Sequence, residues 1–245
     1  MHCEGKRVVI ITGASRGLGR AAALRFGAAG DRVIINYREQ RDQALATAED
    51  VRARGGEAVL FPADVRRSSE VDALVTDAVG RWGRIDVLVN SAGMARDGLA
   101  VRMSDRDWDD VLDTNLRGPF LCMRAVSRVM MQQRSGHIIS LSSISGLQGR
   151  EGQANYSASK AGLIGLSRAA AAELGPHSIQ VNVVLPGYIG TDLGETVRDD
   201  VRRRILAENA LGRTNEPAEV AEFIYRLTLM HNVSGQVFNL DSRLL

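Results

Sequence analysis

The stretch "TGASRGLG" (12–19) decides the fold, because it joins a short β-branched run to an alanine-rich helical segment. The run before it is "RVVIIT" (7–12), and the helical pattern of 17–29 begins inside the motif. Its three glycines follow the spacing G-x-x-x-G-x-G, which lets a backbone turn sharply and a pyrophosphate approach a helix N-terminus. Parallel α/β proteins without nucleotides also use turn glycines. The position directly after a first strand nevertheless favours a dinucleotide site.

Along the rest of the chain, short β-branched runs alternate with longer segments of helical periodicity. Further strands are predicted at 32–37, 58–64, 85–92, 136–143, 179–186 and 235–241. Helices are predicted over 17–29, 40–54, 68–82, 104–134 and 153–175. Several strands are apolar on both faces, as expected for parallel strands covered by helices on each side. The pattern predicts an α/β fold, a doubly wound (Rossmann) parallel sheet of seven strands with helices on both faces.

The segments show no linker or repeat, so residues 1–245 are interpreted as a single domain. Within the helix predicted over 104–134, Pro119 marks a bend or a boundary. The least regular stretch, 186–215, is interpreted as a substrate lid, although a plain helical insertion fits it equally well.

Composition narrows the class of protein. The net charge is +2, and acids interrupt the arginines in runs such as "VRDDVRRR" (197–204), which argues against nucleic-acid binding. Cys3 and Cys122 lack a CxxC or Cys/His neighbourhood, so neither a disulfide nor a metal site is expected. No apolar run is long enough to span a membrane, and the N-terminus leaves no room for a signal peptide. A cytoplasmic enzyme is the expectation.

The end of the second strand indicates which dinucleotide binds. It reads "NYRE", with Tyr37 and Arg38 where NAD sites usually place an acid that bonds the ribose. Arg16 lies inside the glycine-rich turn. Two guanidinium groups can hold a 2′-phosphate through charge-assisted hydrogen bonds, so NADP(H) is predicted. The alternative is that both are ordinary solvent-facing arginines.

The motif "YSASK" (156–160) contains one of only two lysines in the chain. On a helix, Tyr156 and Lys160 project side by side, because residues four apart share a face. A phenol has a pKa of about 10, and a nearby ammonium favours the phenolate. Lysine suits this role better than arginine, since its charge is compact and its donors can also reach a ribose hydroxyl. The pair predicts an acid–base tyrosine with a lowered pKa, although such pairs also occur on ordinary surfaces.

Six motifs together carry a family resemblance. They are "TGASRGLG", "VNSAG" (89–93), "TNLRGPF" (114–120), "SLSSISG" (140–146), "YSASK" and "LPGYIGTDL" (185–193). Their order over nearly the whole chain resembles the classical short-chain dehydrogenases/reductases. Segments 93–116 and 153–175 most resemble the 3-oxoacyl-[acyl-carrier-protein] reductases of that family. The resemblance implies NADPH-dependent reduction of a 3-oxoacyl thioester, carried by acyl carrier protein, to the 3-hydroxyacyl product.

The resemblance also implies roles for single residues. Tyr156 resembles the general acid, and Lys160 the residue that lowers its pKa and holds the nicotinamide ribose. Ser143, chosen among four nearby serines by its spacing from the tyrosine, resembles the serine that bonds the carbonyl. Asn115 resembles the asparagine that holds a relay water, although it could also cap or bend a helix. The implied cofactor site comprises Gly13, Ser15, Arg16, Gly17, Leu18, Gly19, Tyr37, Arg38, Asp64, Val65, Asn90, Ala92, Gly93, Tyr156, Lys160, Pro186, Gly187, Ile189 and Thr191.

The chain departs from the family pattern near its end. Family members commonly finish the last strand with Asp-Gly-Gly, and here the sequence reads "LDSRLL" (240–245). Of two basic positions that would meet an acidic carrier protein, one holds Arg134 and the other His177, which is mostly neutral at pH 7. Family members are usually homotetramers that pack helices equivalent to 104–134 and 153–175.

Two other functions remain open. The departure from the family pattern at residues 240–245 suggests a second hypothesis. In it, the protein is a ketoreductase for another carbonyl, such as a specialised-metabolite intermediate. A dinucleotide-binding regulator without catalysis is disfavoured, because all four implied catalytic residues are present.

Overall fold

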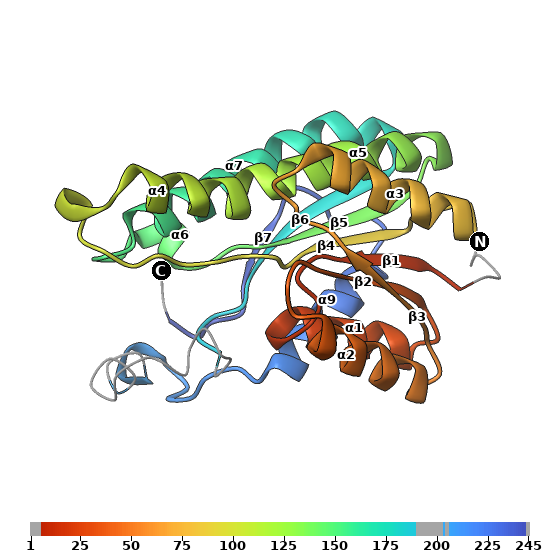
Figure 1. The fold of residues 1–245 in the computed structure, drawn as a ribbon. Coiled ribbons are helices and arrows are strands. Elements are labelled where there is room, and N and C mark those ends of the chain that lie inside the picture. The colour runs from red at the N-terminus through yellow and green to blue at the C-terminus, as the bar shows by residue number, and fades with distance from the viewer. Residues whose placement is uncertain (1–5, 190–202, 204–205, 244–245) are drawn as a thin grey trace.

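The computed structural model describes residues 6–189, 203 and 206–243. Within them, seven parallel strands form one sheet in the order β3-β2-β1-β4-β5-β6-β7 (Figure 1). The strands are β1 (Val8–Ile11), β2 (Arg32–Tyr37), β3 (Glu57–Pro62), β4 (Val87–Asn90), β5 (Gly136–Leu141), β6 (Ile179–Leu185) and β7 (Val237–Asn239). The order reverses between β1 and β4, which is where doubly wound sheets bind ligands. The predicted sheet is confirmed.

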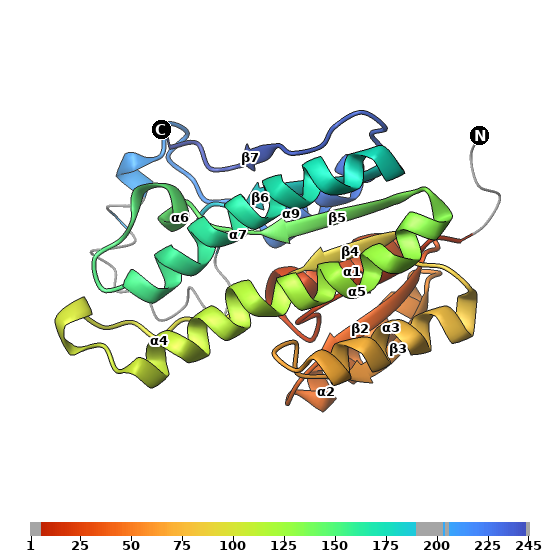
Figure 2. The same cartoon turned by 90° about the horizontal axis from the view of Figure 1, so that it is seen from above.

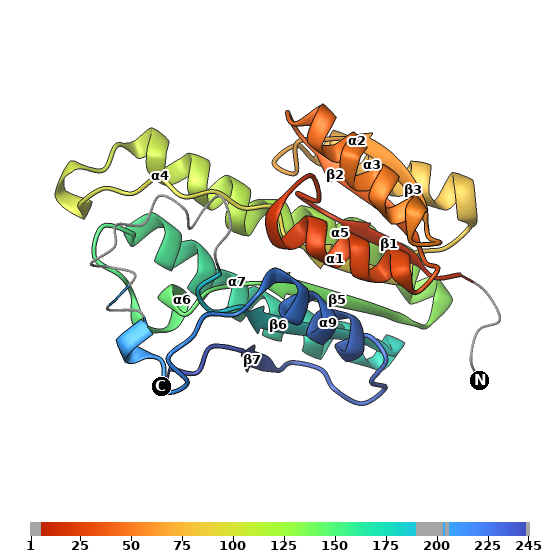
Figure 3. The ribbon, with the colours of Figure 1, turned by 90° about the horizontal axis from the view of Figure 1, so that it is seen from below.

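Helices cover both faces of the sheet. One face carries α3 (Ser68–Trp82), α5 (Gly118–Gln133) and α7 (Ala154–Leu174), seen from above in Figure 2. The other carries α1 (Gly17–Ala28), α2 (Arg41–Ala53) and α9 (Pro217–Leu227), seen from below in Figure 3. Two shorter helices, α4 (Asp105–Leu112) and α6 (Ser145–Gln148), lie near the carboxyl ends of the strands.

The strand β1 contributes to two hydrophobic cores, one on each face of the sheet. Val9 and Ile11 pack with residues of α1, α2 and α9, whereas Ile10 packs with residues of α3, α5 and α7. All three side chains are fully buried. Successive side chains of a strand point to opposite faces, so a strand covered on both sides is apolar throughout. This is why the strands lack a polar alternation in the sequence.

The helix predicted over 104–134 is not continuous. Ser104 caps α4 by accepting a hydrogen bond from the N–H of Asp107. A π-helical turn, Asp113–Arg117, separates α4 from α5. Pro119 is the second residue of α5, where its missing N–H costs little, so it marks a boundary as predicted. The π-helical turn was not foreseen, and such turns are frequent at functional sites.

The helix α9 was not predicted from the sequence. Glu216 and Glu219 form a capping box at its start, and Pro217 is its first residue. The helix packs on α1, where Tyr225 meets Phe26 edge-on with ring centroids 5.5 Å apart. Of the predicted lid at 186–215, only 186–189, 203 and 206–215 are among the described residues. No described helix is both long and apolar enough to cross a membrane.

Candidate active site

The glycine-rich turn leaves no space for larger residues. Gly13 and Gly17 have φ of 63° and 55°, in the region that favours glycine. A Cβ on Gly13 would lie 2.8 Å from Cα of Ala92, and a Cβ on Gly19 would lie 2.4 Å from the carbonyl oxygen of Gly13. The turn is therefore packed backbone to backbone. It presents the N-terminus of α1 to the adjoining cavity, as a pyrophosphate requires.

This cavity, of about 940 Å³, runs along the carboxyl ends of the strands. Of the predicted cofactor residues that the structure describes, all but Asn90 line it. Asn90 is buried, and its amide donates a hydrogen bond of 3.3 Å to the hydroxyl of Ser140, which joins β4 to β5. Thr191 lies outside the described residues. The residues present fit an extended dinucleotide that enters over the glycine turn.

Tyr156 and Lys160 lie side by side on α7, as their spacing predicts. The Nζ atom of Lys160 is 5.5 Å from the centroid of the Tyr156 ring. The same ammonium donates a hydrogen bond of 2.8 Å to the carbonyl of Leu141, at the end of β5. Burial lowers the pKa of Lys160 to about 8, so the side chain keeps most of its charge at neutral pH. Both residues line the cavity.

The pKa of the tyrosine shifts in the direction opposite to the prediction. Burial raises the pKa of Tyr156, and a hydrogen bond with Ser143 opposes this effect without reversing it. The charge of Lys160 is not among the causes of the shift, so desolvation of the phenolate dominates. The phenol therefore stays protonated at neutral pH, which is the state a proton donor needs.

Among the four described serines near the end of β5, geometry singles out Ser143. Ser142, Ser143 and Ser145 all line the cavity, but of these only Ser143 is hydrogen-bonded to Tyr156 among the described contacts. The hydroxyl of Ser142 donates to the α7 backbone at 2.8 Å, and Ser140 is completely buried. The N–H of Ser145 donates to the Ser143 hydroxyl at 3.2 Å, which orients it. The residue chosen by spacing is the one that meets the tyrosine.

Asn115 has a positioning contact rather than a place in the cavity wall. It is completely buried within the π-helical turn. Its Oδ1 accepts a hydrogen bond of 2.8 Å from the N–H of Met94, and its Nδ2 donates to the carbonyl of Met94 at 2.9 Å. Nδ2 also donates to the hydroxyl of Ser159 at 3.2 Å. The side chain thus ties the loop after β4 to α7, and its predicted role in holding a water stays a prediction.

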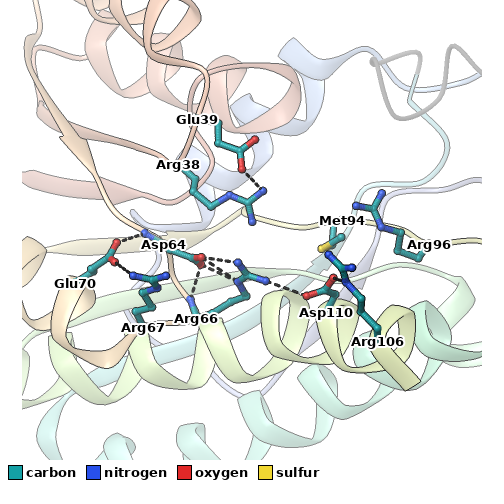
Figure 4. A pocket seen from close by; sticks show the side chains of 10 residues that line it. All are labelled: Arg38, Glu39, Asp64, Arg66, Arg67, Glu70, Met94, Arg96, Arg106 and Asp110. Carbon is teal, nitrogen blue, oxygen red and sulfur yellow. Dashed lines mark hydrogen bonds and ion pairs between the residues drawn. The ribbon is translucent and has the colours of Figure 1, made fainter. Parts of the chain in front are cut away.

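Next to the end of the cavity formed by Arg38 and Asp64 lies a second pocket, which is rich in ion pairs (Figure 4). Arg38 pairs with Glu39 at 2.6 Å, and both line the main cavity and a neighbouring one of about 480 Å³. Burial would raise the pKa of Asp64, but hydrogen bonds from Arg66 outweigh burial and lower it. Arg66 also bridges to Asp110 of α4 at 3.1 Å. Asp64, one of the predicted cofactor-binding residues, is therefore already paired with an arginine.

Sequence reasoning missed two residues of this region. Glu39 follows Arg38 in the quoted "NYRE", so the signal was visible, but only the structure pairs the two side chains. Gln153 lines the cavity near Tyr156, and its amide donates to both carboxylate oxygens of Asp97, at 3.1 and 3.2 Å. The contact fastens the loop after β4 to the start of α7, and spacing along the chain gives no hint of it.

A doubly wound sheet, a glycine turn at its switch point and a serine–tyrosine–lysine group beside it define a class of protein. This class is the nicotinamide-dependent oxidoreductases, which act on a carbonyl or a hydroxyl group. Residues 7–202 match the family model described as short chain dehydrogenase. The chain belongs to the short-chain dehydrogenase family, and the predicted resemblance is confirmed.

Individual relatives agree with this assignment. A 3-oxoacyl-[acyl-carrier-protein] reductase of Synechocystis is 43% identical over 96% of this chain and 95% of its own length. A reductase of the same name from Staphylococcus epidermidis is 43% identical over 88% of each chain. A crystal structure described as that of a short-chain alcohol dehydrogenase from Sinorhizobium meliloti has a TM-score of 0.92 and 30% identity. That match covers 96% of this chain and 95% of the other.

Proposed function

We propose that the protein reduces a 3-oxoacyl thioester, bound to acyl carrier protein, to the 3-hydroxyacyl thioester with NADPH. The observation that carries the substrate class is the 43% identity with a reductase of that name over 96% of the chain. The reaction type is supported independently, because Ser143, Tyr156 and Lys160 line one cavity with the glycine turn.

The bound cofactor supplies the hydride. Ser143 and Tyr156 orient the substrate by donating hydrogen bonds to the carbonyl oxygen, on which negative charge develops. Tyr156, held protonated by its raised pKa, gives its phenolic proton to that oxygen. The charge of Lys160 is not among the causes of that pKa shift, so its proposed role is to face the phenolate that remains, 5.5 Å from the ring centroid, and to bond the ribose. One N–H of the Lys160 ammonium donates to the carbonyl of Leu141, and the others can donate to a ribose hydroxyl.

NADP(H) is the proposed form of the cofactor. Arg16 and Arg38 line the cavity at the glycine turn and at the end of β2, and guanidinium groups suit a 2′-phosphate. Glu39 opposes this preference, because it pairs with Arg38 at 2.6 Å and would compete with the phosphate for the same donors. The preference for NADPH is therefore expected to be moderate.

The proposal includes carrier docking near Arg134 and a homotetramer in the cytoplasm. Arg134 caps the end of α5 and donates to the carbonyl of Pro176 at 3.0 Å. It precedes the first residue of β5, whereas Ser143 follows the last, and six strand residues span about 20 Å. Arg134 therefore lies about 20 Å from Ser143, and a carrier docked there must either bridge that distance or serve another copy of the chain.

The test is a substrate panel with NADPH and with NADH. It compares 3-oxoacyl thioesters on carrier protein, the same acyl groups on coenzyme A, and free ketones. We expect the highest kcat/KM for carrier-bound substrates with NADPH. A higher kcat/KM for free ketones would favour the ketoreductase for another carbonyl, and no turnover of any substrate would favour a regulator.

A further inference from the structure

Residues 240–243 lie behind one wall of the cavity. Residues 186–189 form this wall, which adjoins Tyr156 and Lys160 along the cavity. In Figures 2 and 3 the C-terminal segment lies beside the segment that precedes α9. The contacts below connect residues 240–243 to both segments. We call Asn215, Asp241 and Arg243 the C-terminal clasp.

Asn215 joins the wall to the tail through one amide group. Its Nδ2 donates to the carbonyl of Pro186 at 3.0 Å and to the carbonyl of Leu240 at 2.7 Å. The N–H of Leu240 donates in turn to the carbonyl of Leu185 at 2.9 Å. The backbone at Leu185 and Pro186, where the wall begins, is thus held by two hydrogen bonds. Both N–H groups of the Asn215 amide donate, one to this backbone and one to the tail.

Asp241 is packed against the wall itself. Gly187 has φ of +76°, and a Cβ placed on it would lie 3.1 Å from Cβ of Asp241 and 3.2 Å from its Oδ2. The side chain of Asp241 is only 1% exposed. A carboxylate at that depth needs a partner, because an uncompensated buried charge is strongly unfavourable.

Arg243 supplies that partner from two residues away. Its Nε donates to Oδ2 of Asp241 at 2.8 Å, its Nη2 donates to the same oxygen, and its N–H donates to Oδ1 at 3.0 Å. The Arg243 side chain is 14% exposed. Between the two, Ser242 donates to Oδ1 of Asn209 at 2.9 Å and accepts from the N–H of Leu211 at 3.2 Å. The tail therefore also fixes the segment that leads back to Asn215.

We propose that the C-terminal clasp positions the wall 186–189 and thereby the nicotinamide end of the cofactor site. This rests on the proposed function, since it requires a nicotinamide dinucleotide in the cavity. Asn215, Asp241 and Arg243 do not line the cavity. They can therefore affect cofactor binding only by changing the position of residues 186–189. The glycine turn and Arg38, at the adenosine end, share no hydrogen bond with the clasp among the described contacts.

The test compares two probes that occupy different parts of the site. NADP⁺ fills both ends, whereas 2′,5′-ADP occupies only the adenosine end. In Arg243→Met, the buried carboxylate loses its partner, and we expect the Kd of NADP⁺ to rise about tenfold or more. The Kd of 2′,5′-ADP should stay within about twofold. Both constants are measured by fluorescence titration, without turnover.

Matched variants separate positioning from a general loss of stability. Arg226→Met removes an exposed arginine that pairs with Glu222 on α9, and both affinities should remain unchanged. Arg243→Lys keeps the charge and should restore part of the NADP⁺ affinity. Asn215→Ala removes only hydrogen bonds. It should also raise the Kd of NADP⁺ and leave that of 2′,5′-ADP unchanged, so it tests the proposal even if Arg243→Met does not fold.

Three outcomes would overturn the proposal in different ways. Unchanged NADP⁺ binding in both Arg243→Met and Asn215→Ala would refute the clasp alone. Equal weakening of both probes would show a general effect on the fold, and would also refute it. A wild-type protein that binds neither NADP⁺ nor NAD⁺ would refute the proposed function, and the clasp with it.

Discussion

The ammonium of Lys160 lies 5.5 Å from the centroid of the Tyr156 ring and is bonded to a strand-end carbonyl, that of Leu141, at 2.8 Å. Lys160 is only 6% exposed. A buried lysine that donates to a single acceptor among the described residues is unfavourable for stability, because desolvation disfavours its charge. The arrangement makes sense when the charge serves a reaction at the neighbouring phenol.

Removing the phenolic hydroxyl tests the proton donor. In Tyr156→Phe, we expect kcat to fall at least about 100-fold, the lower end of the range for one acid–base group. Binding of NADP⁺ should change by less than about twofold, because the ring and Lys160 remain. Steady-state kinetics and a separate fluorescence titration measure the two effects. Tyr225→Phe, on α9, is the control, and retained turnover in Tyr156→Phe would refute the assignment.

Replacing Lys160 by methionine tests the cost of the buried charge. The folded-state pKa of Lys160, about 8, lies below the unfolded value of about 10.4. Between these values the unfolded chain holds the proton and the folded chain does not, so the wild type gains stability as pH rises through this window. The methionine variant has no such slope. Its stability relative to the wild type should therefore drop by about 3 kcal/mol between pH 8 and 10.5.

Urea denaturation at several pH values measures this difference in the free energy of unfolding. The control is Lys6→Met, which removes an exposed lysine paired with Glu57 and leaves Lys160 in place, so this variant should keep the Lys160 slope. A difference between wild type and Lys160→Met that stays constant over the window would mean that Lys160 is not desolvated.

The pair Arg38–Glu39 allows a prediction on cofactor choice. Its atoms are 2.6 Å apart, but both side chains are largely exposed, and such pairs contribute about 1 kcal/mol or less. Glu39→Gln should therefore raise kcat/KM for NADPH about two- to fivefold and leave NADH unchanged. Arg38→Gln should lower kcat/KM for NADPH about tenfold or more, since it removes charge-assisted hydrogen bonds. An exposed glutamate far from the cavity, in Glu173→Gln, is the control.

Initial rates with each cofactor check this prediction. If Glu39→Gln and Arg38→Gln shift NADPH and NADH equally, Arg38 does not meet a 2′-phosphate. The preference would then have to come from Arg16 alone, or the cofactor would be NAD(H).

Much of the fold follows from short-range patterns. The β-branched runs and the glycine spacing of 13, 17 and 19 are local properties, and the structure reproduces them. The helix α9 was missed because it follows the irregular stretch 186–215. Its capping box, Glu216 to Glu219, was nevertheless present in the sequence. Its apolar face makes sense only against Phe26 and its neighbours on α1.

The site was predictable to the extent that spacing governs it. Tyr156 and Lys160 are four positions apart on a helix, and this spacing places their side chains next to each other. The direction of the tyrosine pKa shift was not predictable, because it depends on how deeply the fold buries the phenol. The contact between Gly187 and Asp241 joins positions 54 residues apart in number, and no pattern in the sequence links them.

Two buried asparagines allow the role of the π-helical turn to be isolated. Asn115 bonds Met94 and Ser159, beside the cavity, whereas Asn182 in β6 donates to Val233 at 2.7 Å. Leucine at either position leaves buried backbone groups without partners. Each variant should therefore lose about 2–4 kcal/mol of unfolding free energy. Only Asn115→Leu should also lose kcat, by about tenfold or more, because Met94 belongs to the cavity wall.

Denaturant unfolding and steady-state kinetics measure both quantities. An equal loss of kcat in Asn182→Leu would mean that lowered stability alone explains the effect, and that the tie from Asn115 to Met94 has no part in positioning the site.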